Sequence, residues 1–297
     1  MAQLKEIKLR ISGIKKTKQI TNAMKMVATS RLRGTQLRME AFRPYAEKFS
    51  EVLGSLASRA GEDLDVPLLK AKEAVKRIHV ILMTSDRGLC GGFNANLIEQ
   101  AEAFLTSLED RDVEVSFSAF GKKGRDWCRK EEMALDAEYV GVVGTKLDFG
   151  IASTTAQTLI GRFLEDTYDE VYVIYSHFVS MGKQVPTLAQ LLPIPPIEAS
   201  DAEENDITGY QAEHICEPSP VQLMNDLLPR SIAIQVFNAL LETSTSEHAA
   251  RMSAMDNATK ACNDMVKELQ RLFNKARQAA ITSDLMDIVG GAEALKG

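Results

Sequence analysis

The sequence predicts an α/β plus coiled coil protein. Its N- and C-terminal helices are expected to form a long antiparallel two-helix coiled coil, with an α/β domain between them in the chain. Two observations predict this class. Residues near both termini repeat at alternating intervals of three and four, which places one stripe of a helix against a partner helix. Between the termini, short β-branched runs alternate with helical patterns, as in a mostly parallel sheet.

The first predicted element is a helix over residues 1–58, with its regular pattern starting at residue 3. Pro44 lies inside it, and an interior proline is expected to bend this helix without ending it. Two runs and a later continuation mark the predicted buried face: Leu4, Ile7, Ile11 and Ile14, then Ile20, Met24, Val27, Arg31 and Gly34, then Phe49, Leu53 and Leu56. The spacing between the first two runs is irregular, which predicts local overwinding of the coiled coil.

A Rossmann-like α/β domain is predicted over residues 75–195. Its strands are expected at 77–84, 113–120, 139–143 and 170–176, with an antiparallel edge strand at 184–191, and its helices at 94–108, 122–129 and 149–168. Strands and helices in alternation predict a mostly parallel, doubly wound sheet. Residues 196–220 are rich in proline and acidic side chains and are predicted to form a surface linker.

The last element, residues 221–297, is predicted to be the second helix of the coiled coil. Its stripe has an unbroken 4-3 spacing: Leu241, Thr245, His248, Met252, Met255, Thr259, Cys262, Val266, Leu269, Phe273, Ala276 and Ala280. Because Thr, His, Cys and Ala replace many of the usual Leu, Ile and Val, this stripe buries less apolar surface per turn. The alternative is one long core helix of an all-α domain.

Charge is unevenly distributed along the chain. Residues 1–38 hold ten basic side chains and one acidic one, so this stretch carries +9 although the whole chain carries −6. Such asymmetry predicts a solvated helical face, an acidic protein partner or a nucleic acid. Nucleic acid is the least favoured, because the basic segment lacks interleaved aromatic residues.

Composition argues against several classes of protein. With 45% hydrophobic and 26% charged residues, the chain is typical of ordinary soluble proteins. No run approaches the roughly 18 apolar residues of a membrane-spanning helix. The four cysteines lack metal-ligand spacing, and the four histidines are isolated from one another.

The loop after the first predicted strand, SDRGLCGGFNANL, is the one candidate for chemistry. Its glycines, Gly88, Gly91 and Gly92, lie between a strand and a helix, where dinucleotide folds bind phosphates. Their spacing matches neither the dinucleotide fingerprint nor a P-loop, so a tight structural turn is favoured over nucleotide binding or Cys90 catalysis. Asp86 and Asp148 near strand ends have no acidic partner in the pattern.

Several long segments resemble the γ subunit of the F-type ATP synthase. They are IKKTKQITNAMKMVATSRL (Ile14–Leu32), SDRGLCGGFNANL (Ser85–Leu97), EPSP (Glu217–Pro220), ALLETSTSEHAARMSAM (Ala239–Met255) and FNKARQAAITSDLMDIVGGAEAL (Phe273–Leu295). This resemblance implies a central rotor shaft, without catalytic residues or a cofactor of its own, that couples proton flow to ATP synthesis. Asp256 and Lys260 depart from the family, which more often has the basic and acidic residues in the opposite order, so their spacing of four predicts an ion pair of reversed polarity.

The resemblance also implies partners and contact residues. The partners are the α and β subunits of the catalytic hexamer, the ε subunit and the c-subunit ring, without nucleic acid and with membrane contact only through the complex. The implied location is peripheral, on the cytoplasmic face of the bacterial inner membrane. The residues expected to contact the catalytic ring are Met24, Arg251, Arg277, Gln278 and Thr282, and Met26, Met252 and Met255 are expected to be neighbours across the helix pair.

The residues taken alone leave another function open. A nucleotide-binding α/β enzyme with a coiled-coil arm would bind nucleotide saturably through the loop that contains Gly91 and Gly92. A nucleic-acid-binding coiled coil would instead bind through the N-terminal lysines, with a steep dependence on salt. The rotor subunit predicts neither behaviour in the isolated chain.

Overall fold

A computed structural model describes residues 2–60, 66–72, 74–145, 147–195 and 220–294. The chain forms two compact units. Unit 1 comprises Met1–Thr29 and Arg251–Gly297, and unit 2 comprises Ser30–Ala250. The predicted linker over 196–220 lies outside the described residues except for Pro220, and the predicted domain boundaries stay a prediction.

Two long helices contribute residues to both units. Helix α1 covers Ala2–Ala60 and continues through Pro44, as expected from the sequence. Helix α5 covers Pro220–Ala294 and continues through Pro229. Pro220 is tolerated because the first N–H groups of a helix have no partner within it, whereas Pro229, nine residues further on, removes one hydrogen bond of the helix. No helix among the described residues is both long and apolar enough to cross a membrane.

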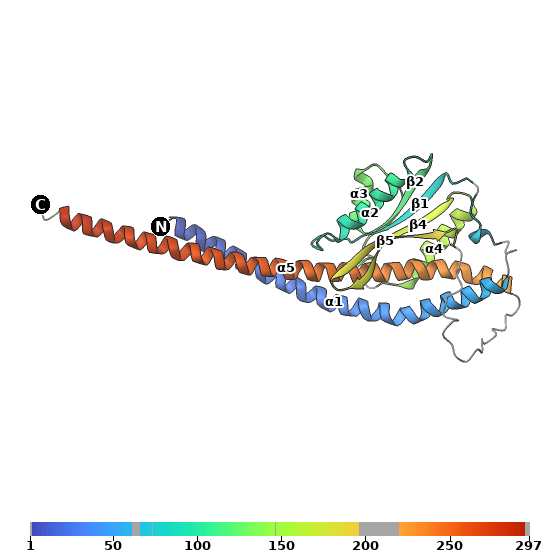
Figure 1. The fold of residues 1–297 in the computed structure, drawn as a ribbon, viewed down its shortest axis with the longest axis horizontal. Coiled ribbons are helices and arrows are strands. Elements are labelled where there is room, and N and C mark those ends of the chain that lie inside the picture. Colours follow the sequence, from blue (N-terminus) through green and yellow to red (C-terminus); the bar gives the residue numbers. More distant parts are fainter. Residues whose placement is uncertain (1, 61–65, 73, 146, 196–219, 295–297) are drawn as a thin grey trace. The chain divides into compact units, whose positions relative to one another are not determined.

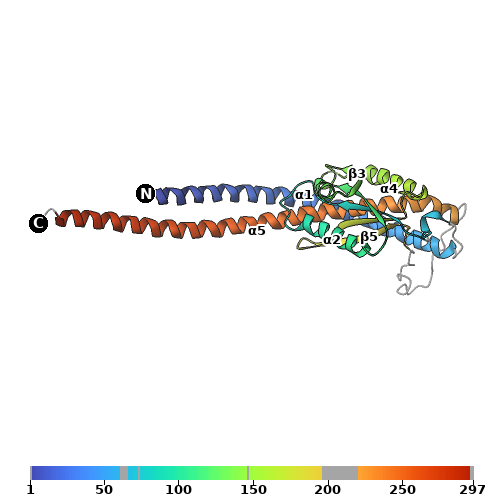
Figure 2. The same ribbon diagram turned by 90° about the horizontal axis from the view of Figure 1, so that it is seen from above.

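In unit 1, the stripe predicted on α5 is confirmed. From Asp264 to Ala280, the positions that are not exposed are Val266, Leu269, Phe273, Ala276 and Ala280, all of them members of the predicted stripe. Here α1 and α5 lie side by side (Figure 2). Bonds join Thr21 to Thr259 and Lys25 to Asp256, so residue numbers rise on one helix as they fall on the other and the pair is antiparallel.

The predicted stripe on α1 is partly wrong. Its first run is confirmed, but the spacing then continues without irregularity, and the buried or half-buried positions of the stripe in unit 1 are Leu4, Ile7, Ile11, Ile14, Lys18, Thr21, Lys25 and Ala28. Met24 of the second predicted run is half-buried, whereas Ile20 and Val27 are 60% and 56% exposed. Apolarity alone gives a wrong prediction here because several α1 positions that face α5 are small or polar. The polar ones, Thr21 and Lys25, bond to α5.

Unit 2 is built on a five-stranded sheet with the order β3-β2-β1-β4-β5. Strand β1 is parallel to both β2 and β4, β2 is parallel to β3, and β5 pairs with β4 in the antiparallel direction, as predicted. The strands are β1 (Arg77–Met83), β2 (Glu114–Phe120), β3 (Ala134–Tyr139), β4 (Glu170–Ser180) and β5 (Lys183–Leu192). The remaining elements are η1 (Pro67–Leu69), α2 (Phe93–Leu108), α3 (Lys122–Lys130) and α4 (Phe149–Leu164).

Helices cover both faces of this sheet, as in a doubly wound fold (Figure 1). On one face, Leu97 of α2 and Trp127 of α3 pack with Val80 and Phe117 of the central strands. On the other face, α4 and the unit 2 part of α5 pack against residues such as Ile81. Strand β1 lies between the two layers, which explains its nearly continuous apolar sequence.

The third strand was misplaced by the sequence prediction. Residues 139–143 were expected to be extended, but β3 ends at Tyr139. Gly141 and Gly144 have φ angles of +81° and +78°, which an extended strand does not adopt. The strand itself shows a period of two, with Leu135, Ala137 and Tyr139 more buried than their neighbours. That weak alternation is typical of an edge strand with one covered face.

Candidate functional site

The glycine-containing loop after β1 is held by bonds among its own residues. Ser85 donates a hydrogen bond from Oγ to the Arg87 carbonyl at 2.6 Å, and its backbone N–H donates to Asn94 Oδ1 at 3.0 Å. The Asn94 amide also donates to the buried Cys90 sulfur at 3.2 Å. Gly91 has a φ of +60°, as a tight turn requires. These contacts fit the structural turn that the sequence favoured.

The two aspartates singled out in the sequence hold backbone groups in place. Asp86 accepts hydrogen bonds from the N–H of Lys122 at 3.0 Å and of Gly141 at 2.9 Å, so it joins the segments that follow the C-terminal ends of β1, β2 and β3. Asp148 is the N-cap of α4 and accepts from the N–H of Gly150 at 3.2 Å. Within the described ranges, no group of three or more His, Cys, Asp or Glu is arranged to hold a metal ion.

A buried histidine in the middle of the sheet was missed by the sequence analysis. The ring nitrogens of His79 lie 2.7 Å and 2.8 Å from the hydroxyls of Ser116 and Ser118, and its ring stacks on Tyr168. Burial lowers the pKa of His79 from 6.5 to about 4, against the opposing effect of Asp136. Since the serines lie on the neighbouring strand, only strand register could have revealed this set.

A run of six polar residues in α5, Thr243–His248, is buried in unit 2. Two of its side chains form hydrogen bonds to the main-chain atoms of one β4 residue, Ser176. The N–H of Ser176 donates to Thr243 Oγ1 at 3.3 Å, and Ser246 Oγ donates to the Ser176 carbonyl at 3.2 Å. Ser176 lies beyond Ile174, the last β4 residue paired with β1, and its partner on β5 is Pro186, which lacks an N–H. The helix therefore supplies hydrogen bonds to Ser176 where β1 no longer does.

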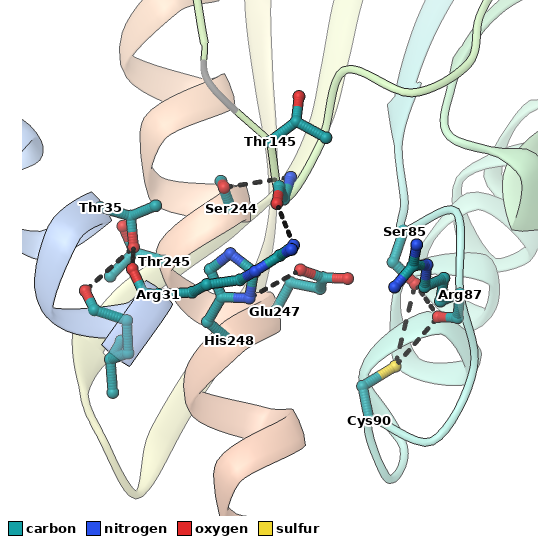
Figure 3. Close-up of polar contacts among 12 residues, drawn as sticks. Arg31, Thr35, Ser85, Arg87, Cys90, Thr145, Ser244, Thr245, Glu247 and His248 are labelled. Carbon is teal, nitrogen blue, oxygen red and sulfur yellow. Dashed lines mark hydrogen bonds and ion pairs between the residues drawn. The ribbon is translucent and has the colours of Figure 1, made fainter. Parts of the chain in front are cut away.

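Two further side chains of this run contact the loop between β3 and α4 (Figure 3). The N–H of Gly144 donates to Ser244 Oγ at 3.1 Å, and Arg31 of α1 donates to the Gly144 carbonyl at 3.2 Å. A Cβ added to Gly144 would lie 2.6 Å from Glu247 Oε2, so the carboxylate packs directly on this glycine. We call the six residues that join α5 to the sheet the polar clamp: Thr243, Ser244, Ser246, Glu247, Ser176 and Gly144.

Unit 1 has a different kind of polar contact, between its two helices. Thr21 Oγ1 and Thr259 Oγ1 are 2.8 Å apart, and Lys25 Nζ lies 2.6 Å from Asp256 Oδ1. Lys260 pairs with the other oxygen of Asp256 at 2.7 Å, which confirms the predicted pair of reversed polarity. Hydrogen bonds from Lys25 and then Lys260 lower the pKa of Asp256 to about 2. Spacing within the helix predicts the Lys260 partner, whereas no local pattern marks Lys25.

The five predicted ring-contact residues all belong to unit 1. Met24 and Arg251 are half-buried, whereas Arg277, Gln278 and Thr282 are exposed on α5. Thr282 donates from Oγ1 to the Gln278 carbonyl at 3.0 Å, one turn earlier.

One methionine of the predicted cross-helix set is misplaced. Met26 is 60% exposed and lies off the stripe that faces α5. Met255 is buried and Met252 is half-buried, as residues of the α5 stripe. The error has the same cause as for Ile20 and Val27, because the seam at this level is formed by Thr21, Lys25 and Ala28.

Comparisons with known proteins cover nearly the whole chain. A family model described as ATP synthase matches residues 3–295. The ATP synthase gamma chain of Desulfosudis oleivorans is 62% identical over 100% of both chains, and that of Desulforapulum autotrophicum is 60% identical over 99% of this chain and 100% of the relative. Among solved structures, a chain from the central stalk and c-ring of the Tetrahymena thermophila mitochondrial ATP synthase matches with a TM-score of 0.58 and 26% identity, over 80% of this chain and 99% of that one.

Proposed function

Because the chain belongs to the family of ATP synthase gamma chains, we propose that it is the central rotor subunit of an ATP synthase. One observation carries this proposal, namely the 62% identity to a gamma chain over the full length of both proteins. The fold supports it, since unit 1 is the antiparallel helix pair expected of a shaft. The chain is a subunit of the complex and does not itself carry the catalytic site.

The rotor couples the c-ring to the catalytic hexamer of α and β subunits, and it also binds the ε subunit. It is part of the portion of the complex that is peripheral to the membrane. A shaft of this kind couples distant sites by binding their conformations with different affinities, so that each orientation favours a different state of each β subunit. The bacterial origin of the two relatives named above supports a location on the cytoplasmic face of the inner membrane.

Five residues of unit 1 are proposed to contact the catalytic ring. The exposure of Arg277, Gln278 and Thr282 leaves these three side chains available to a partner. Met24 and Arg251 keep part of their surface exposed. Ile20 and Val27 are exposed on α1, so the surface of unit 1 also includes apolar side chains.

Reconstitution tests the rotor role. The chain is mixed with α and β subunits from the same organism, and the rotation of a probe on unit 2 is followed while ATP is hydrolysed. Stepwise rotation that stops when ATP is removed is expected. An assembled complex that hydrolyses ATP without turning the probe would refute the rotor role, and saturable binding of nucleotide by the isolated chain would favour an enzyme instead.

The contact proposed for Met24 is tested by Met24→Lys in the complete complex. A charge placed without a partner at a sliding contact should lower the number of protons pumped per ATP hydrolysed more than it lowers assembly. Met24→Leu keeps the volume without the charge and is the matched control. Equal proton pumping per ATP in the two variants would argue against the role given to Met24.

A further inference from the structure

We infer that the polar clamp is the joint through which torque passes between the sheet of unit 2 and helix α5. The inference rests on the proposed rotor function and assigns a mechanical role to residues outside the proposed ring contacts. Its starting point is the pairing of the clamp residues. Thr243 and Ser246 both bind Ser176, while Ser244 and Glu247 both contact Gly144.

Each of these pairs is separated by three residues, so its two members lie on the same side of the helix. The second pair is displaced from the first by one residue, which is a rotation of about 100° around the helix axis. Helix α5 is therefore held by contacts from two directions, with β4 on one side and with the β3–α4 loop on the other. Rolling the helix about its axis would break both sets of contacts.

Apolar packing alone would resist such rolling less. Hydrophobic contacts are non-directional, whereas hydrogen bonds weaken steeply when their angles change. The side chains of Thr243, Ser244 and Ser246 are buried, and each forms its bond to main-chain atoms of the sheet or its loop. A buried hydrogen bond adds little to net stability, so what these hydroxyls add beyond apolar side chains of similar size is a defined orientation.

The β3–α4 loop is itself fixed to the other long helix. Arg31 of α1 donates to the carbonyl of Gly144, while Ser244 accepts from its N–H. One glycine thus connects α1, α5 and the loop that follows β3 within unit 2 (Figure 3). A torque applied to the sheet would reach both helices through this residue.

The chain supplies a matched pair of variants for the test. Thr243→Val removes the hydroxyl that accepts from the N–H of Ser176. Thr245→Val removes an equally buried hydroxyl from the same helix, but that hydroxyl donates only within α5, to the Leu241 carbonyl at 2.8 Å. Both variants replace threonine with the same β-branched residue, so they differ in the contact to the sheet.

Both variants are assembled into the complete complex, which is held on a surface by its catalytic ring. A probe is attached through Met181→Cys, at a residue that is 56% exposed near the end of β4. The angular fluctuation of the probe is recorded with the rotor stalled in the absence of ATP, and the thermal stability of each complex is measured alongside.

Thr243→Val is expected to widen the angular distribution relative to the parent and to Thr245→Val. If the three hydroxyl bonds act as equal springs in parallel, losing one raises the angular variance roughly 1.5-fold. Equal widths for the two variants would overturn the inference, even if Thr243→Val lowered the thermal stability. If the complex with the unaltered chain does not rotate with ATP, the rotor function itself is refuted. Failure of the clamp inference and failure of the rotor function are therefore distinguishable.

Discussion

The two parts of helix α5 differ in how they are held. From Ile232 to Ala249 in unit 2, the helix is buried or half-buried at every position, and polar residues of this segment bond to backbone atoms of the sheet and its loop. From Asp264 to Ala280 in unit 1, one narrow stripe is shielded and the other positions are exposed. One continuous helix therefore serves as a core element in one unit and as half of a two-helix pair in the other.

This difference teaches where the helix tolerates change. In unit 2, each side chain meets several neighbours from different elements, so both volume and polarity are constrained. In unit 1, the exposed surface is available to other subunits of the complex, and the seam depends on fewer contacts per turn. Substitutions of the same type should therefore have unequal effects in the two units, and the following tests start from the largest difference.

The largest effect is expected from truncating leucine in each unit. Leu240→Ala leaves a cavity in the unit 2 core, where Leu240 is fully buried, and should lower the free energy of unfolding by about 3 kcal/mol. Leu269→Ala in unit 1 removes a half-buried side chain and should cost about 1 kcal/mol, because solvent can fill part of the space. Urea unfolding of the full chain measures both. Equal losses of unfolding free energy would contradict the distinction between a closely packed core in unit 2 and a partly exposed helix–helix contact in unit 1.

A smaller effect is expected from adding a methyl group to one of two glycines in the same loop. Gly144→Ala must strain a φ of +78° and also push against Glu247, so it should lower stability by about 2 kcal/mol. Gly141→Ala has the same kind of strain, at a φ of +81°, but meets nothing within 4 Å and should cost about 1 kcal/mol. Thermal unfolding compares the two variants, and identical melting temperatures would show that the Glu247 side chain moves away from the added methyl group at little cost.

At mildly acidic pH, the smallest effect is a difference in acid sensitivity between the units. The native pKa of His79 in unit 2 is lowered to about 4. Between pH 6.5 and 4, His79 is therefore mostly protonated in the unfolded chain and mostly neutral in the folded chain. Stability should fall as the pH drops from 6.5 toward 4, by about 1 kcal/mol at pH 5.5. The native pKa of Asp256 in unit 1 is lowered to about 2, so its contribution is present above pH 3.8 and is lost between pH 3.8 and 2.

Chemical denaturation at several pH values separates the two windows. His79→Gln can still bond to a neighbouring serine hydroxyl but does not titrate, so its stability should be nearly flat between pH 6.5 and 5. Asp256→Asn should leave that range unchanged and flatten the response below pH 4. A slope between pH 6.5 and 5 that persists in His79→Gln would assign it to another group.

Much of the fold could be predicted because its signals are local. The 4-3 spacing identified the stripe on α5 from Val266 to Ala280, and the β-branched run RIHVILM identified β1. These patterns depend on periodicity within one element, which a sequence displays directly.

What could not be predicted depends on pairs of residues far apart in the chain. The seam of α1 was misassigned because Thr21 and Lys25 are favourable there only through Thr259 and Asp256, more than 200 positions away. The polar clamp was missed for the same reason, since a run of Thr and Ser in a helix has no apolar period. The ring contacts came from a family resemblance, because no local pattern marks them.

The bond from Lys25 to Asp256 has a further consequence, for how the chain folds. If α5 were shifted by one heptad, the apolar stripe would still face α1, but Lys25 would meet the level of Asn263 and Thr21 that of Val266. The misaligned pair would keep most of its buried surface while losing an ion pair and a hydroxyl contact. These polar residues thus let two helices that are far apart in the chain settle in a single alignment during folding.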